Sequence, residues 1–233
     1  MSSATRTNPS ENITICSGRI RLEGLFGIPE SPLGVVLFAH GSGSGRFSPR
    51  NNFVARQLQE GSLATLLIDL LDPVESEDRQ KVFDIDLLAD RLLLAKAWLT
   101  HDPRTTHLRI GYFGASTGAG AALQAAARGP ASIAAVVSRG GRPDLAEPYL
   151  SRVTAPTLLI VGGHDEPVIE MNREDYAQLR CEKEIVIVPG ATHLFEEPGT
   201  LEQVADHARE WFQRHFAQAS PRPPQVTRKE VSR

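Results

Sequence analysis

The stretch IGYFGASTGAGAALQAAAR, residues 110–128, carries the strongest local structural signal in the sequence. Its first four residues form a short apolar run, which is typical of a buried β-strand. Residues 119–128 are small and have helical character. Between these two parts lie Gly114, Ser116 and Gly118, in a Gly-x-Ser-x-Gly pattern. The stretch therefore predicts a strand that turns sharply into a helix, with Ser116 at the turn.

Such a turn has consequences for the serine. It strains the backbone of Ser116, and glycines two residues before and after it remove side chains that would clash. The Ser116 hydroxyl then projects near a helix N-terminus, whose N–H groups point at any developing negative charge. We interpret Ser116 as a nucleophile. A glycine-rich turn without chemistry is the alternative, and the glycine spacing disfavours a dinucleotide fingerprint.

Strand and helix signals alternate outward from this stretch. Short apolar runs that predict buried strands lie at residues 35–39, 63–70, 133–138, 156–161 and 185–188. Helical periods lie at residues 53–58, 84–99 and 201–212. Near the start, two pairs of apolar residues flank Ser17-Gly18 and predict an antiparallel hairpin. The whole pattern predicts an α/β fold with a sheet covered by helices on both faces.

A serine needs a base to become a nucleophile, and the base needs a group that orients it. His193 follows the predicted strand 185–188, and Asp165 follows the predicted strand 156–161. The carboxyl ends of parallel strands meet at one edge of the sheet, so both should lie near Ser116. We therefore assign Asp165 as the acid and His193 as the base.

Other residues compete for these two roles. Glu166 and Asp144 are weaker candidates for the acid, and a capping or ion-pair role suits Asp69 better. The remaining histidines are expected to be solvated or structural: His40, His101, His107, His164, His207 and His215. A metal site formed by several of these groups is disfavoured, because their spacing matches no zinc pattern.

The loop HGSGSG, residues 40–45, follows the predicted strand 35–39. Its glycines allow a backbone N–H to approach a substrate oxygen, so we assign the oxyanion donors to the N–H groups of Ser42 and Thr117. A flexible loop without a role is the alternative. A phosphate loop is disfavoured, because no Lys-Ser or Lys-Thr follows.

Composition excludes several classes of protein. The chain has 233 residues, of which 41% are hydrophobic and 23% charged, with a net charge of −3. These values favour one globular domain and argue against a nucleic-acid partner. No apolar run of about 18 residues predicts a membrane span. A polar start without a signal-peptide core, and only Cys16 and Cys181, favour a cytoplasmic location.

Both ends are expected to be flexible tails. Residues 1–11 and 218–233 are polar or proline-rich, with no apolar period. The predicted domain covers residues 12–217, with no linker that divides it.

Four motifs, taken in their order along the chain, resemble those of the α/β-hydrolase superfamily. Their particular residues resemble those of its dienelactone-hydrolase-like branch. The motifs are HGSG at 40–43, GASTG at 114–118, GGHD at 162–165 and ATHLF at 191–195. The resemblance implies a mostly parallel sheet of about eight strands with antiparallel N-terminal strands. The short connection at about residues 140–155 predicts that the fold has no large lid. It also implies Ser116 as nucleophile, Asp165 as acid and His193 as base. Dienelactone hydrolases carry a cysteine as the nucleophile in this strand-to-helix turn, which we call the elbow. This chain carries Ser116 there.

These observations favour a serine hydrolase that cleaves carboxylic esters of small molecules and needs no metal or organic cofactor. A thioesterase, acyltransferase or peptidase on the same scaffold is the first alternative, and a non-catalytic binding module is the second. The oligomeric state is left open.

Arg139 ends the predicted strand after the elbow and could hold an anionic group of the substrate. An ion pair with a neighbouring acidic loop is the alternative for Arg139, as it is for Arg46 and Arg50.

Overall fold

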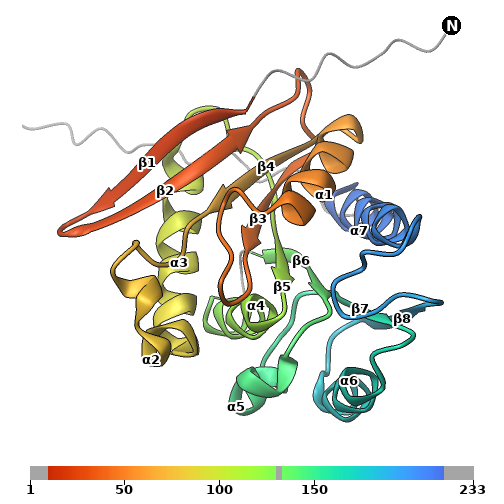
Figure 1. The fold of residues 1–233 in the computed structure, drawn as a ribbon. Coiled ribbons are helices and arrows are strands. Elements are labelled where there is room, and N and C mark those ends of the chain that lie inside the picture. The colour runs from red at the N-terminus through yellow and green to blue at the C-terminus, as the bar shows by residue number, and fades with distance from the viewer. Residues whose placement is uncertain (1–9, 130–132, 218–233) are drawn as a thin grey trace, which may run out of the picture.

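The computed structural model describes residues 10–129 and 133–217. Eight strands form one sheet in the order β1-β2-β4-β3-β5-β6-β7-β8 (Figure 1). Their bounds are β1 Glu11–Ser17, β2 Ile20–Gly27, β3 Gly34–Ala39, β4 Leu63–Ile68, β5 Ile110–Ala115, β6 Ile133–Arg139, β7 Thr157–Gly162 and β8 Lys183–Val188.

Strand direction agrees with the prediction. β1 pairs with β2, and β2 with β4, in antiparallel fashion. All other neighbours are parallel. The predicted hairpin at Ser17-Gly18 and the mostly parallel eight-stranded sheet are therefore confirmed.

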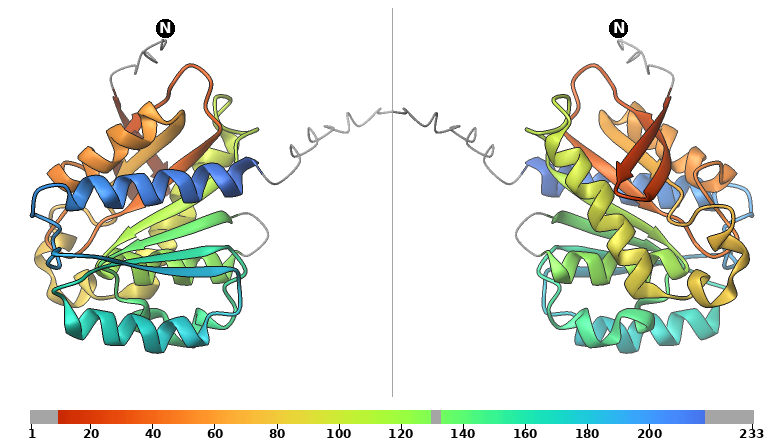
Figure 2. Two further views of the ribbon diagram at one scale, coloured as in Figure 1. Left: turned by 90° about the vertical axis from the view of Figure 1, so that its right-hand side faces the viewer. Right: turned by 90° about the vertical axis from the view of Figure 1, so that its left-hand side faces the viewer.

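Helices cover both faces of this sheet (Figure 2). The longer ones are α1 Pro49–Glu60, α3 Ile85–His101, α4 Thr117–Arg128, α6 Glu166–Gln178 and α7 Thr200–Ala217. Short helical turns are η1 Glu75–Glu77, α2 Arg79–Val82, η3 Pro143–Ala146 and α5 Glu147–Leu150. α1 packs against α7, and α3 packs against α4.

Apolar side chains from the two faces of the sheet form two core clusters. One joins the sheet to α3 and α4, through residues such as Leu92 and Leu123. The other joins it to α1 and α7, through residues such as Leu58 and Phe212. The central strands β3, β4, β5 and β7 are buried along their whole length. Burial on both faces explains why they are continuous apolar runs rather than alternating ones.

The connection between β6 and β7 is the usual place to look for a lid. It holds only the short helices η3 and α5. The prediction of a fold without a large lid is confirmed.

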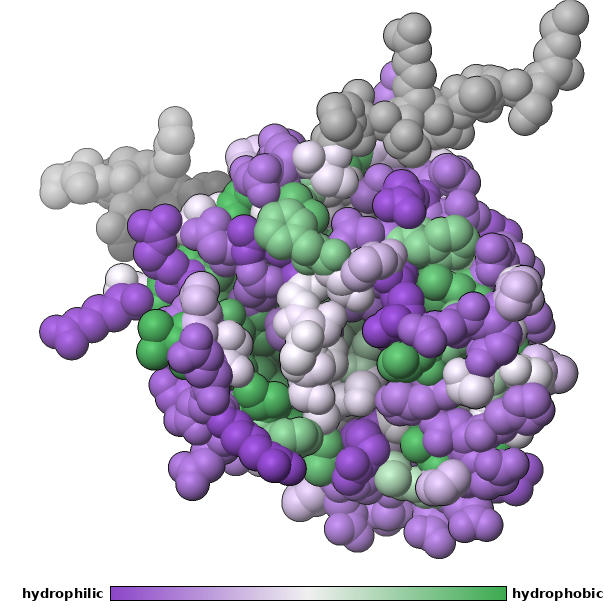
Figure 3. All heavy atoms as spheres, in the orientation of Figure 1, coloured by the Kyte–Doolittle hydropathy of each residue, from purple (hydrophilic) through white to green (hydrophobic). Residues whose placement is uncertain are grey.

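The predicted tails fall mostly on residues 1–9 and 218–233, outside the described residues, and β1 begins at Glu11. The domain bounds 12 and 217 stay predictions. Within the described part of the chain, every helix is too short or too polar to cross a bilayer. On the face drawn in Figure 3, hydrophobic residues form separate small groups among hydrophilic ones.

Candidate active site

Ser116 lies between the end of β5 and the first residue of α4. Its backbone has φ 51° and ψ −124°, a conformation that side-chain-bearing residues rarely adopt. Three hydrogen bonds hold it there: the Ser116 N–H donates to Arg139 O at 3.2 Å, and Ser116 O accepts from the N–H groups of Ala119 at 3.0 Å and Arg142 at 3.1 Å. Strained residues persist only where the surroundings hold them, and such residues concentrate at functional sites. The predicted sharp turn is present.

Close packing around the turn explains its glycines. A Cβ added to Gly118 would lie 2.3 Å from Ala39 O, and one added to Gly114 would lie 2.4 Å from the Cα of Ala119. A Cβ on Gly41 would lie 3.0 Å from the Cβ of Ser116. The loop after β3 therefore packs directly against the nucleophile turn, as the oxyanion assignment requires.

The structure pairs the predicted base with the predicted acid. His193 Nδ1 and Asp165 Oδ2 lie 2.7 Å apart, and their side chains are 38% and 14% exposed. A carboxylate at Nδ1 favours the tautomer that carries its proton there, which leaves Nε2 as the free basic nitrogen. Among the described residues no hydrogen bond joins Ser116 Oγ to His193. Catalytic hydrogen bonds of this kind often tighten only when substrate binds.

His193 lies close to the elbow all the same. A Cβ added to Gly140 would lie 3.5 Å from His193 Nδ1. Gly140 directly follows Arg139, whose carbonyl holds the Ser116 N–H. All three residues of the assigned triad thus lie at the carboxyl edge of the sheet, on the loops after β5, β7 and β8.

Glu197 is tied to the loop that carries His193, a contact that the sequence did not predict. Its carboxylate accepts from the N–H of Thr192 at 3.0 Å and from the Thr192 hydroxyl at 2.7 Å. These hydrogen bonds lower the pKa of Glu197. Because Thr192 directly precedes His193, Glu197 closes the loop that carries the base. A carboxylate four residues after the histidine was the only signal in the sequence.

A hydrogen bond joins the two residues assigned as oxyanion donors. The Ser42 N–H donates to Thr117 Oγ1 at 3.0 Å. This bond ties the loop after β3 to the N-terminus of α4, where the Ser116 side chain makes no capping hydrogen bond. The Ser42 N–H is thus held near the elbow and is engaged with the threonine hydroxyl.

His40 has a structural role, as predicted. Its Nδ1 lies 2.9 Å from Gly41 O, and its Nε2 accepts from the Leu70 N–H at 3.0 Å. Burial lowers the pKa of His40, although the Gly41 carbonyl and the nearby charge of Asp69 act in the opposite direction. The neutral ring therefore joins the loop after β3 to the end of β4 and has no free nitrogen for catalysis.

Several charged residues near the site form ion pairs. Asp69 pairs with Arg46, and Asp144 pairs with Arg142 at 2.7 Å. The ion-pair role expected for Asp69 is confirmed, and the partner of the Asp144 carboxylate is Arg142.

Arg139 differs from these arginines. It is 8% exposed, and its Nε and Nη1 are buried with no hydrogen-bond partner among the described residues. Burial lowers its pKa to about 10, and the nearby charge of Arg50 acts in the same direction. The guanidinium is still protonated at neutral pH.

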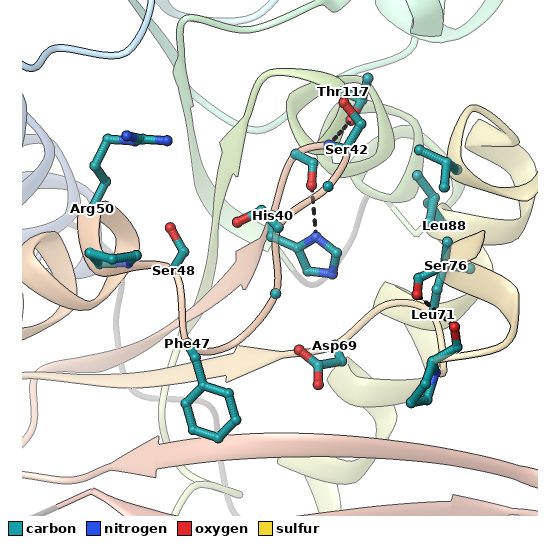
Figure 4. A pocket seen from close by; sticks show the side chains of 17 residues that line it. His40, Ser42, Phe47, Ser48, Arg50, Asp69, Leu71, Ser76, Leu88 and Thr117 are labelled. Carbon is teal, nitrogen blue, oxygen red and sulfur yellow. Dashed lines mark hydrogen bonds between the residues drawn. The ribbon is translucent and has the colours of Figure 1, made fainter. Parts of the chain in front are cut away.

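A cavity of about 670 Å³ adjoins the elbow. Ser42 and Thr117 line its end nearest the site, Arg50 lies on one side, and Leu71 and Leu88 lie on the opposite side (Figure 4). Ser116, Asp165 and His193 lie outside its lining. The cavity therefore offers mixed polar and apolar space next to the assigned oxyanion donors. Across residues 10–129 and 133–217, no three His, Cys, Asp or Glu side chains are grouped to hold a metal ion.

This fold, with a strained serine after β5 and a paired histidine and aspartate at the same edge, defines an α/β hydrolase. The model of the dienelactone hydrolase family matches residues 22–218. The chain therefore belongs to the dienelactone hydrolase family.

Comparisons with individual proteins agree on the fold. The crystal structure of a dienelactone hydrolase from Anabaena variabilis ATCC 29413 is 55% identical, with a TM-score of 0.85, over 91% of this chain and 99% of that one. XC6422 from Xanthomonas campestris, described as an a/b serine hydrolase without lid, is 20% identical, with a TM-score of 0.74, over 94% of this chain and 100% of that one. At that identity the likeness shows the fold alone.

The curated relatives that match, from two strains of Mycobacterium tuberculosis, are not named as hydrolases. A Mycobacterium tuberculosis protein named "Putative phosphoribosyl transferase" is 54% identical over 211 residues. The match covers 91% of this chain but 48% of the relative, so this chain spans about half the length of that protein.

Proposed function

We propose that this protein is a serine hydrolase that cleaves carboxylic ester bonds of small molecules. The observation that carries the proposal is the 2.7 Å contact between His193 and Asp165, at the same sheet edge as the strained Ser116. A base held by a carboxylate, at the same sheet edge as a partly exposed serine, is the arrangement that acyl transfer needs. Membership of a hydrolase family supports the same reaction class.

In the proposed reaction, Ser116 Oγ attacks the ester carbonyl carbon while its proton passes to His193 Nε2. The carbon–oxygen bond to the alcohol then breaks, and the same proton passes to the leaving alkoxide. Water then attacks the acyl-enzyme: its proton goes to His193 and its oxygen bonds to the carbonyl carbon. The bond between that carbon and Ser116 Oγ breaks, the acid leaves, and Ser116 Oγ takes the proton from His193. Asp165 holds the imidazole tautomer and stabilises the imidazolium that forms twice.

The N–H groups of Thr117 and Ser42 are the proposed donors to the oxyanion. Thr117 is the first residue of α4, so its N–H lies at the positive end of a helix dipole. The Ser42 N–H would exchange its Thr117 Oγ1 acceptor for the developing oxyanion. The adjoining cavity of about 670 Å³ has the size of a small-molecule site and is the proposed space for part of the substrate. The proposal involves no metal or organic cofactor.

The cytoplasm is the proposed location. Cys16 and Cys181 are both free thiols, and free thiols persist in reducing compartments.

Thioesterase, acyltransferase and peptidase activities are rival outcomes on the same triad. Phosphoribosyl transfer is a further candidate, because the relative of that name is 54% identical. Phosphoribosyl transfer ranks below ester hydrolysis because this chain covers only 48% of that relative. The chain covers 99% of the dienelactone hydrolase that is 55% identical.

A substrate panel tests the proposal. Purified protein and the Ser116→Ala variant are assayed on short-chain esters, matched thioesters, peptides, and phosphoribosyl diphosphate with nucleobases. We expect the esters to be hydrolysed fastest and Ser116→Ala to lose at least about 10³-fold in kcat. Faster turnover of any other class, or an active Ser116→Ala variant, would contradict the proposal.

A further inference from the structure

The histidine assigned as the base lies on the loop after an edge strand. β8 is the last strand in the order of the sheet (Figure 1). β5 and β7, which precede Ser116 and Asp165, each lie between two neighbouring strands. In β8 only Val188 is buried. The loop that carries His193 therefore has less of the sheet around it than the loops of the other two residues, and its position depends on contacts of its own.

Backbone contacts hold the carbonyl groups of this loop. The N–H of His164, beside the assigned acid, donates to Ala191 O at 2.9 Å. The N–H of Phe195 donates to Thr192 O at 3.2 Å, and the Phe195 side chain is 1% exposed. These bonds fix the chain on both sides of His193. They leave the N–H and the hydroxyl of Thr192 to be satisfied by another group.

One carboxylate accepts from both of these donors. Glu197 Oε2 accepts from the Thr192 N–H at 3.0 Å, and Glu197 Oε1 accepts from the Thr192 hydroxyl at 2.7 Å. Two acceptors on two donors of the same residue fix its rotation as well as its place. The hydroxyl and N–H of Thr192 also lower the pKa of Glu197, so this carboxylate is ionised wherever a histidine can act as a base.

Glu197 is itself attached to a long helix. Its carbonyl accepts from the N–H of Thr200 at 3.1 Å and from the Thr200 hydroxyl at 2.7 Å. Thr200 is 4% exposed and is the first residue of α7. α7 packs against β6, β7 and β8. A continuous set of contacts therefore runs from this helix through Glu197 and Thr192 to the residue before the base.

Stability and substrate contact are weak explanations for this carboxylate. Its bonds to Thr192 lie at the protein surface, where a hydrogen bond adds little to the free energy of unfolding. Glu197 lies outside the lining of the cavity next to the elbow. Position is a stronger explanation, because a shift of about 1 Å in a catalytic group can lower the rate about 10²-fold.

We propose that Glu197 is a positioning residue, which holds Thr192 and thereby keeps the imidazole of His193 in place for proton transfer. The inference rests on the proposed hydrolysis and adds to it the group that fixes the base from the side opposite Asp165. Glu197 contacts no substrate and transfers no proton in this account. Its loss reduces the fraction of molecules in which the base is correctly placed, so it lowers kcat and leaves KM nearly unchanged.

Steady-state hydrolysis of 4-nitrophenyl butyrate by three variants tests the proposal. Glu197→Ala should lower kcat by about 10- to 30-fold, with KM within about twofold and a melting temperature within about 2 °C of the wild type. Glu197→Gln loses the charge but keeps an acceptor oxygen, so it should retain kcat within about threefold. Glu210→Ala removes an exposed carboxylate of α7 and should leave kcat unchanged.

A double-mutant cycle tests whether Glu197 acts through Thr192. Thr192→Val removes the hydroxyl donor and keeps the N–H, so it should lower kcat by a smaller factor than Glu197→Ala, about 3- to 5-fold. In the Glu197→Ala background the same substitution should have almost no further effect, because its partner is already gone. Two losses that multiply would show that the residues act independently and would overturn the proposal.

Hydrogen exchange gives a readout that needs no activity. The Phe195 N–H, bonded to Thr192 O, should exchange at least about fivefold faster in Glu197→Ala and at the wild-type rate in Glu197→Gln and Glu210→Ala, as followed by NMR. If the wild type cleaves no ester, the proposed function fails and this exchange still tests the positioning role.

Three results would each overturn the proposal. One is an unchanged kcat, or an unchanged Phe195 exchange rate, in Glu197→Ala. Another is an equal loss of kcat in Glu197→Gln and Glu197→Ala, which would show that the charge matters and the placement does not. The third is a loss of kcat accompanied by a clearly lower melting temperature, which would show a role in folding alone.

Discussion

Asp165 is the residue on which the orientation of the base depends. Its Oδ2 lies 2.7 Å from His193 Nδ1, and its side chain is 14% exposed. An amide at this position could donate to Nδ1 and so favour the wrong tautomer. We predict that Asp165→Asn lowers kcat by about 10³- to 10⁴-fold while the melting temperature changes little.

Glu166 provides the matched control for this variant, because it is the adjacent carboxylate and is solvent-exposed. Glu166→Gln should retain kcat within about twofold, since exposed side chains away from the reaction contribute little. Equal losses in both variants would show that Asp165 is not the specific partner of His193.

Some residues of the candidate site could be predicted from the sequence and others could not. Ser116, Asp165 and His193 could be located because each follows a strand signal and the three occur in a fixed order. That Arg139 Nε and Nη1 are buried without a hydrogen-bond partner among the described residues could not be predicted, because it depends on side chains that pack together from distant parts of the sequence. Glu197 was missed for the same reason: its role is apparent only once the turn around Thr192 is closed.

At the scale of elements, the contact between α4 and the end of β3 fixes the geometry of the turn. Gly118 is its tightest point, since an added Cβ would lie 2.3 Å from Ala39 O and 2.5 Å from His40 O. Backbone atoms cannot move aside as a flexible side chain can. We predict that Gly118→Ala destabilises the protein by about 3 kcal/mol and reduces turnover, because the loop after β3 must shift.

Gly129, at the other end of the same helix, is the control position for Gly118. Its added Cβ would meet first the flexible Lys96 Nζ, at 3.1 Å. Gly129→Ala should therefore change the free energy of unfolding by no more than about 0.5 kcal/mol. Denaturant unfolding of both variants decides the point, and a Gly118→Ala variant as stable as the wild type would contradict this packing.

Helices and strands differ in how clearly their sequence predicts them. Strands β3 to β7 are continuous apolar runs, and α3 and α7 have clear apolar periods, so all of them were located, although the predicted period of α7 ends at residue 212 and the helix at Ala217. α6 was not predicted, because its buried residues are Val168, Asn172 and Asp175, two of which are polar. The short helices η3 and α5 were missed because four residues are too few to show a period.

At the scale of the whole molecule, stability should depend on pH through Asp175. Burial raises the pKa of this carboxyl to about 6, and the charges of Asp144, Glu147 and Glu174 add to the effect. The unfolded chain ionises near its ordinary value of about 3.9. A raised folded pKa means that ionisation destabilises the fold, so the penalty is absent below pH 4 and complete above pH 6.

We therefore predict that Asp175→Asn melts a few degrees above the wild type at pH 8 and that this gap closes by pH 4. His40 acts in the opposite direction, because burial lowers its pKa and its protonation destabilises the fold in acid; comparing the two proteins at each pH cancels it. Glu170→Gln, on the exposed side of α6, should show no such gap. A lower melting temperature for Asp175→Asn at pH 8 would contradict the assignment.

The central claim is that Ser116 is an activated nucleophile, and covalent labelling tests it most directly. A fluorophosphonate reacts with a serine only where a neighbouring base and an oxyanion site assist it. After labelling, intact-protein and peptide mass spectrometry should show one adduct, on the peptide that contains Ser116. The adduct should be absent from Ser116→Ala and form more slowly in Asp165→Asn. An unlabelled wild type, or an adduct that persists in Ser116→Ala, would contradict the account.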